Sequence, residues 1–189
     1  MTFRCFISHP WAGNIHHFAL RLCDALRERQ VEVWIDQEQM LPGQKISVRQ
    51  HHGIVHESDI FLFVLAPTTL DSENCMEELE CALVHRKPII VALVERCSVP
   101  EALSDSIFVD FSNPVFFESA VDRLLAGAAK QAEWQAILGR LNDDDADKRI
   151  DAIDLLTDMQ DPAAFPAVTR RLMIERDDSV RQWLARFFG

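Results

Sequence analysis

The chain has 189 residues, 48% of them hydrophobic, which is enough for one domain of ordinary size and a smaller second unit. Its formal net charge of −11 and its lack of a basic block argue against a nucleic-acid or anionic-membrane partner, because such partners bind clustered Lys and Arg. No apolar run reaches the length of a membrane span, and the N-terminal residues enter a strand-like run without signal-peptide features, so we expect a cytoplasmic protein.

Strand-like and helix-like segments alternate over the first two-thirds of the chain. Strands are predicted over residues 3–8, 31–36, 60–65, 89–94 and 108–111. Helical spacing is found over residues 15–29 and 46–57, from Cys75 onward, and over residues 114–128. Strands separated by helices indicate βαβ units with right-handed crossovers. The predicted fold is therefore α/β, a flavodoxin-like five-stranded parallel sheet over residues 1–128.

Residues 129–189 show helical patterns only. Helices are predicted over residues 134–141 and 147–159, from Asp161 onward, and over residues 179–188. The segments DADKRIDAIDLL and DDSVRQWLARFF echo one another, and their arginines, Arg149 and Arg181, are 32 residues apart. This period is typical of helical repeats, and two repeats bury too little surface to stand alone. We therefore expect this region to pack on the α/β domain or on a second protomer.

The stretch over residues 58–83 joins a buried strand to an amphipathic helix that carries three neighbouring glutamates. Helical spacing predicts one core face, made of Cys75, Met76, Leu79, Ala82 and Leu83. Glu77 then points away from the core, Glu80 lies toward the far flank, and Glu78 falls at the border. Ligand crevices of open α/β sheets lie at the carboxyl edge of the strands, where such a helix begins. Glutamates here also suit a solvated face near a helix N-terminus, but Glu78 is placed to reach a crevice.

Neither the cysteines nor the histidines indicate a metal site. The cysteines at positions 5, 23, 75, 81 and 97 are scattered through apolar patterns without a CxxC pair, which favours small buried residues. His16 with His17, His51 with His52, and the single His56 and His85 show no metal-ligand spacing, and we interpret them as exposed or ordinary helical positions.

Four segments within residues 1–126 together resemble the TIR domains of the bacterial and plant enzymatic type. They are FISH (6–9), VEVWIDQEQMLPG (31–43), SDIFLFVLAPTTL (58–70) and SENCMEEL (72–79), in the order of the family and at fitting distances. The second segment corresponds to the second strand and the BB loop of that family, and Pro42 with Gly43 is its turn signal. The helical tail over residues 129–189 resembles HEAT-like repeats.

The resemblance implies an enzyme that cleaves the nicotinamide–ribose bond of NAD, giving ADP-ribose or a cyclic variant in immune and antiviral signalling. NAD is then a substrate, no cofactor is needed, and the TIR domain self-associates. The family pattern WCxxEL corresponds to CMEEL (75–79), which makes Glu78 the catalytic residue. The implied substrate-binding residues are Ser8, His9, Pro10, Trp11, Asp36, Gln39, Met40, Leu41 and Cys75. The implied assembly loop contains Pro42, Gly43 and Lys45.

The chemistry of NAD makes a single carboxylate sufficient for this reaction. Its nicotinamide is a cationic pyridinium, so it departs as a neutral molecule without a general acid. The transition state resembles an oxocarbenium ion, as in glycoside hydrolysis. One glutamate can hydrogen-bond the ribose hydroxyls and stabilise that cation electrostatically.

The chain departs from the family pattern at two positions. Asn74 stands where the family has tryptophan before the cysteine, and Arg4 stands where an acidic residue is usual. Asn74 is a candidate N-cap for the following helix, and Trp11 in the first loop is a candidate substitute for the missing aromatic surface.

Two other functions fit the same architecture. A non-catalytic adaptor would use TIR–TIR contacts through the BB loop, although such members typically lack the glutamate. A receiver-like phosphoacceptor domain would need acidic residues where this chain has Ser8 and His9, and an Asp near Ala66, so we set it aside. For the tail, a regulatory or oligomerising role with a protein partner and a stabilising cap are both open.

Overall fold

The structure is a computed structural model that describes residues 3–11, 13–35, 55 and 57–188. Contacts within the chain divide it into two compact units, residues 1–130 and 131–189, with the division falling inside one helix. The predicted helix over residues 46–57 and the loop before it lie outside the described residues, apart from Val55 and Glu57. None of the helices in the described part of the chain combines the length and apolar content that crossing a bilayer requires.

The first unit contains a five-stranded parallel sheet with the strand order β2-β1-β3-β4-β5, as predicted. Its strands are β1 (Arg4–Ser8), β2 (Glu32–Ile35), β3 (Ile60–Leu65), β4 (Ile89–Leu93) and β5 (Ile107–Asp110). Every residue of β3 is buried, because this central strand is covered on both faces. The position of β1 beside β3 brings the carboxyl end of β1 into the middle of the sheet, next to Phe63.

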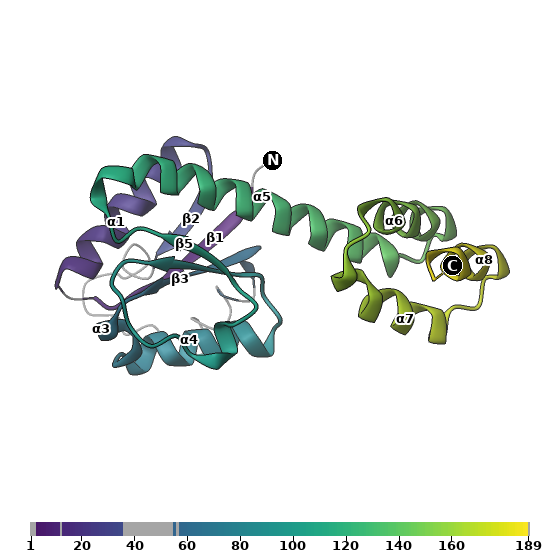
Figure 1. Ribbon diagram of the computed structural model, residues 1–189, viewed down its shortest axis with the longest axis horizontal. Helices are drawn as coiled ribbons and strands as arrows, with labels where there is room; N and C mark the ends of the chain where they lie inside the picture. Colours follow the sequence, from purple (N-terminus) through teal and green to yellow (C-terminus); the bar gives the residue numbers. More distant parts are fainter. Residues whose placement is uncertain (1–2, 12, 36–54, 56, 189) are drawn as a thin grey trace. The chain divides into compact units, whose positions relative to one another are not determined.

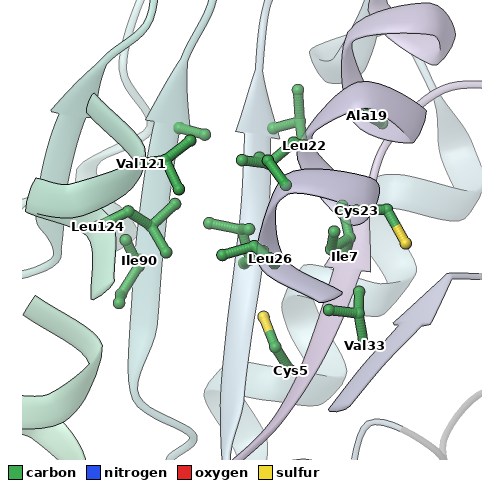
Figure 2. Close-up of a cluster of buried hydrophobic side chains, with 14 of the residues drawn as sticks. Cys5, Ile7, Ala19, Leu22, Cys23, Leu26, Val33, Ile90, Val121 and Leu124 are labelled. Carbon is green, nitrogen blue, oxygen red and sulfur yellow. The ribbon is translucent and has the colours of Figure 1, made fainter. Parts of the chain in front are cut away.

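Helices cover both faces of the sheet (Figure 1). In the first unit they are α1 (Gly13–Glu28), α3 (Pro67–Leu70), α4 (Glu73–Val84) and the start of α5 (Phe117–Leu141), with short 3₁₀ turns at Glu101–Leu103 and Pro114–Phe116. One face carries α1 and α5, whose Leu22, Leu26 and Leu124 pack over Ile7 and Ile90 (Figure 2). The other face carries α4, which packs on Phe6, Phe61 and Phe63.

The helices differ from the prediction at two places. Residues 67–70, for which no helix was predicted, form α3, which begins with a proline at its first position and ends near the cap of α4. Residues 114–128 and 134–141, expected as separate helices, belong to the 3₁₀ turn and a continuous α5. At Gly127, an added Cβ would lie 3.3 Å from Cγ2 of Ile107, so glycine permits the close approach of α5 to β5 without breaking the helix.

The second unit is helical throughout its described residues. It comprises the end of α5, then α6 (Ala146–Met159), a 3₁₀ turn (Pro162–Ala164), α7 (Phe165–Ile174) and α8 (Asp178–Phe187). Asp145 and Asp177 cap α6 and α8 in the same way, each accepting from backbone N–H groups of the first turn. The two arginines of the repeated segments differ, however, because Arg149 is buried and Arg181 is exposed.

A buried ion-pair network centred on Glu175 joins the helices of this unit. Its carboxylate accepts from Nε of Arg149 at 3.0 Å, from Nε of Arg171 at 2.8 Å, and from the backbone N–H groups of Arg176 and Asp177. Arg149 also donates to the Asp143 carbonyl in the turn before α6. Burial alone would raise the pKa of Glu175, but these hydrogen bonds lower it to about 2.

Replacing Glu175 by Gln should therefore destabilise the helical unit. The variant leaves the buried guanidinium of Arg149 and the partly buried one of Arg171 without their carboxylate, and breaking a buried pair typically costs about 3 kcal/mol or more. Chemical unfolding followed by tryptophan fluorescence measures the loss, since Trp134 and Trp183 lie in this unit. Glu133→Gln, at an exposed position of the same unit, is the matched control and should change the free energy of unfolding by less than about 0.5 kcal/mol. Equal stabilities of the two variants would contradict a stabilising role for the network.

Candidate functional site

Strand β1 ends at the carboxyl edge of the sheet with a buried hydroxyl group. Ser8 is 1% exposed, and its Oγ has no hydrogen-bond partner among the described residues. Side chains alternate between the faces of a strand, so Ser8 shares a face with Phe6, which packs in the core beneath α4. A buried hydroxyl without a partner costs free energy, and such a group in a folded protein calls for an explanation such as a bound ligand.

Helix α4 approaches the same face of the sheet and carries the glutamates. It contacts β1, and its Cys75 and Leu79 pack in one cluster with Phe6 and Phe63. Ser72 caps its N-terminus by accepting a hydrogen bond from the backbone N–H of Cys75. The expectation that Asn74 serves as the N-cap was therefore wrong, and Asn74 is exposed in the first turn.

Among the three neighbouring glutamates, only Glu78 is buried. Its residue exposure is 5%, whereas Glu77 and Glu80 are exposed. Glu78 lies one helical turn from Cys75 and from Cys81 and Ala82, so the packed face of the helix holds it. Burial raises the pKa of the Cys81 thiol, and the negative charge of Glu78 raises it further, which shows that the carboxylate lies near this buried cluster.

The predicted core face of α4 was correct in most positions. Cys75, Leu79 and Ala82 are buried and Met76 is half-buried, but Leu83 is 38% exposed. Cys81 takes its place in the core and Glu78 adjoins it, so the buried face is rotated toward Glu78 relative to the prediction. Because of this rotation the Glu78 carboxylate is buried, whereas the sequence pattern places it at the border of the core face.

His9, the residue after Ser8, contacts helix α1. His9 is 3% exposed, and its Nε2 lies 2.9 Å from Nδ1 of His16. The two rings stack with their planes 11° apart and their centroids separated by 5.2 Å. Sequence reasoning missed this role of His16, because it treated the residue as an ordinary helical position. The chain makes the tight turn between the two residues at Gly13, whose φ of 69° favours glycine.

The environment of His9 keeps its ring neutral at physiological pH. Desolvation by burial and the nearby His16 lower its pKa to about 4. The carbonyl of Ile7 favours a proton on the ring, but Nδ1 has no acceptor at hydrogen-bond geometry among the described residues. The carboxyl end of β1 thus holds two neighbouring buried polar atoms, Ser8 Oγ and His9 Nδ1, without partners there.

The remaining predicted site residues divide into two groups. Pro10 is buried beside His9, Cys75 is 2% exposed, and Trp11 presents a partly open indole at 40% exposure. The other predicted positions lie outside the described residues; they are Asp36, Gln39, Met40, Leu41, Pro42, Gly43 and Lys45. The described part of the site therefore consists of the end of β1, the turn after it and one face of α4.

Within the described ranges, no group of three or more His, Cys, Asp or Glu side chains has the arrangement of a metal site. None of the five cysteines, all of which lie in the described part of the chain, forms a disulfide, and four of them are buried.

Comparison with known proteins identifies the family of the first unit. The TIR domain family matches residues 5–125. The chain belongs to the TIR domain family. A curated relative, described as the probable 2′ cyclic ADP-D-ribose synthase BdTIR of Brachypodium distachyon, is 27% identical over 108 residues, which make up 55% of this chain. The matched region spans about half of that relative, 48% of its length.

Solved structures support the fold of the TIR domain but leave its activity open. The TIR domain of the Toll-related receptor TRR-2 from Hydra magnipapillata superposes with a TM-score of 0.57 at 16% identity, covering 67% of this chain and 98% of that one. A 2-deoxyribosyltransferase from Bacillus psychrosaccharolyticus superposes with a TM-score of 0.51 at 14% identity, covering 61% of this chain and 90% of that one. The same fold serves unrelated functions, so the activity has to be argued from the site.

The shifted pKa of His9 predicts a pH-dependent loss of stability. An unfolded histidine has a pKa near 6.5 and the folded one about 4, so the unfolded state binds more protons between these values. The free energy of unfolding should therefore fall as pH decreases from about 6.5 toward about 4, by up to roughly 3 kcal/mol from this group.

Urea unfolding at a series of pH values, compared with His9→Gln, isolates the contribution of this residue. The variant carries no titrating ring and should lose less stability than the wild type across the same window. Parallel pH curves for the two proteins would show that His9 does not titrate as a buried neutral ring.

Proposed function

We propose that the TIR domain of this chain cleaves the nicotinamide–ribose bond of NAD, with Glu78 as the catalytic residue. The observation that carries the proposal is the burial of Glu78, in contrast to the exposed Glu77 and Glu80 on the same helix. A carboxylate is removed from water only at a cost in free energy, so its place on the packed face of α4 is not that of a solvating charge. The CMEEL segment that contains it resembles the catalytic pattern of enzymatic TIR domains.

The proposed reaction requires the carboxylate to act on a developing positive charge. As the bond to the pyridinium nitrogen breaks, its electron pair goes to nicotinamide, which leaves as a neutral molecule. The ribose ring becomes an oxocarbenium-like cation, which the negative Glu78 stabilises in a site of low dielectric constant. Attack by water gives ADP-ribose, and attack by a hydroxyl of the same molecule gives a cyclic product.

The end of β1 supplies the proposed binding groups. Ser8 Oγ shares the sheet face on which α4 packs, and it is free of protein partners among the described residues. We assign it to hydrogen-bonding the sugar or carboxamide of the substrate. The exposed indole of Trp11 offers a flat apolar surface for one of the rings of NAD, in place of the family tryptophan that Asn74 replaces.

Similarity to a protein described as a probable 2′ cyclic ADP-D-ribose synthase supports the class of reaction. It leaves the product open, because the identity is 27% and the chain covers about half of that protein. We further propose that the TIR domain self-associates through the loop containing Pro42, Gly43 and Lys45, and that the helical unit is a HEAT-like regulatory or partner-binding module.

Replacing Glu78 by Gln should abolish nicotinamide release from NAD. The variant keeps the shape of the side chain but removes its charge, and the loss of such electrostatic stabilisation typically lowers kcat by about 100-fold or more. Chromatography of nicotinamide and of the ADP-ribose products measures the rate and identifies linear or cyclic product. Protein concentration should be varied, since proposed self-association would make activity depend on it.

Glu77→Gln and Glu80→Gln are the matched controls, because they change the same residue type at exposed positions of α4. Both should retain wild-type turnover. Turnover that survives Glu78→Gln would remove Glu78 from the mechanism. A wild type that neither releases nicotinamide nor is stabilised by NAD would favour the adaptor role instead.

Replacing Ser8 by Ala should separate stability from activity. The alanine removes a buried hydroxyl that has no protein partner among the described residues, so the free energy of unfolding should stay the same or rise by about 1 kcal/mol. The KM for NAD should rise, because the substrate loses a hydrogen bond. Thermal unfolding measures the stability of the variant, and steady-state kinetics measure its KM for NAD. A destabilised variant with an unchanged KM would show that Ser8 serves the fold alone.

A further inference from the structure

The contact between His9 and His16 joins the carboxyl end of β1 to the first turn of α1. The stacked rings and the 2.9 Å separation of His9 Nε2 and His16 Nδ1 make it a defined interaction. At this distance one nitrogen carries the proton and the other accepts it. The position of that proton decides which face of His9 donates and which accepts.

This contact is the polar anchor of the His9 ring. Nδ1 of His9 has no hydrogen-bond partner among the described residues, so these residues hold the ring through Nε2. Either arrangement of the proton serves the contact, because a neutral imidazole has one nitrogen that donates and one that accepts.

We propose that His16 is a positioning residue for the site: the hydrogen bond between its Nδ1 and Nε2 of His9 fixes the backbone that holds Ser8 and Trp11. His9 is the covalent neighbour of Ser8 and is 3% exposed. Its ring has no second anchor among the described residues, because Nδ1 lacks a hydrogen-bond partner there. The hydrogen bond from α1 is therefore what sets the orientation of this side chain.

A positioning role acts on substrate binding more than on the chemical step. His16 is half-buried on the α1 side of His9, whereas Glu78 lies on α4 on the other face of the sheet. Loss of the hydrogen bond should disturb Ser8 and the turn after it but leave the carboxylate in place. This kinetic part of the inference depends on the proposed NAD cleavage, and the hydrogen bond between the two rings does not.

The test uses a pair of substitutions on the full chain. His16→Phe keeps a flat ring and removes the nitrogen, and His16→Asn restores a polar group near the position of Nδ1, because its amide can donate or accept. We expect His16→Phe to raise the KM for NAD about three- to tenfold, as for a lost neutral hydrogen bond, with kcat within twofold of wild type. His16→Asn should recover most of the wild-type KM. His17→Phe, at the exposed neighbouring position, is the control and should leave KM unchanged.

Nitrogen-15 NMR of the histidine rings gives a readout that is independent of activity. The wild type should show His9, assigned by its absence in His9→Gln, as a neutral ring in a single tautomer. In His16→Phe the ring should become a mixture of tautomers, while His17→Phe keeps the wild-type pattern.

A mixture of His9 tautomers in the wild type would overturn the proposal, as would identical kinetics and spectra for His16→Phe and His17→Phe. If the wild type releases no nicotinamide, the proposed function fails, and the spectra still decide whether His16 is hydrogen-bonded to His9.

Discussion

The burial of Glu78 depends on how α4 is seated against the sheet. Cys75, Leu79 and Ala82 pack on the aromatic face of β1 and β3, and this packing carries the neighbouring carboxylate out of water. A surface helix would gain stability by turning Glu78 to solvent, as it does with Glu77. The apolar contacts thus keep a carboxylate buried that an isolated helix would expose to water.

The two units differ in whether their buried polar groups have hydrogen-bond partners among the described residues. In the helical unit, Glu175 accepts from two arginines and two backbone N–H groups, so its charge is fully compensated and stabilises the packing of the helices. At the end of β1, Ser8 Oγ and His9 Nδ1 have no partners among the described residues. A compensated network belongs to the architecture of a protein, whereas uncompensated polar atoms at the edge of a parallel sheet are suited to a ligand.

The fold and the proposed activity rest on different observations. The fold is shared with a receptor domain and with a 2-deoxyribosyltransferase, so the architecture permits several functions. The proposal of NAD cleavage rests on one buried glutamate and on the unpaired hydroxyl group at the end of the first strand. The fold contributes the geometry, because it brings the carboxyl end of β1 and the start of α4 to the same region of the sheet.

The sequence by itself determined the features that depend on local patterns. The apolar run at residues 60–65 and the strand–helix alternation predicted the parallel sheet, and helical spacing singled out Glu78 among its neighbours. Only the tertiary structure decided what depends on packing between distant segments. Arg149 meets Glu175 across 26 residues, and His16 in the first turn of α1 meets His9 at the end of β1 across 7 residues. The exposure of Leu83 and the burial of Glu78 follow from a rotation of α4 that periodicity alone does not fix, because helical spacing gives the faces of a helix but not its partner.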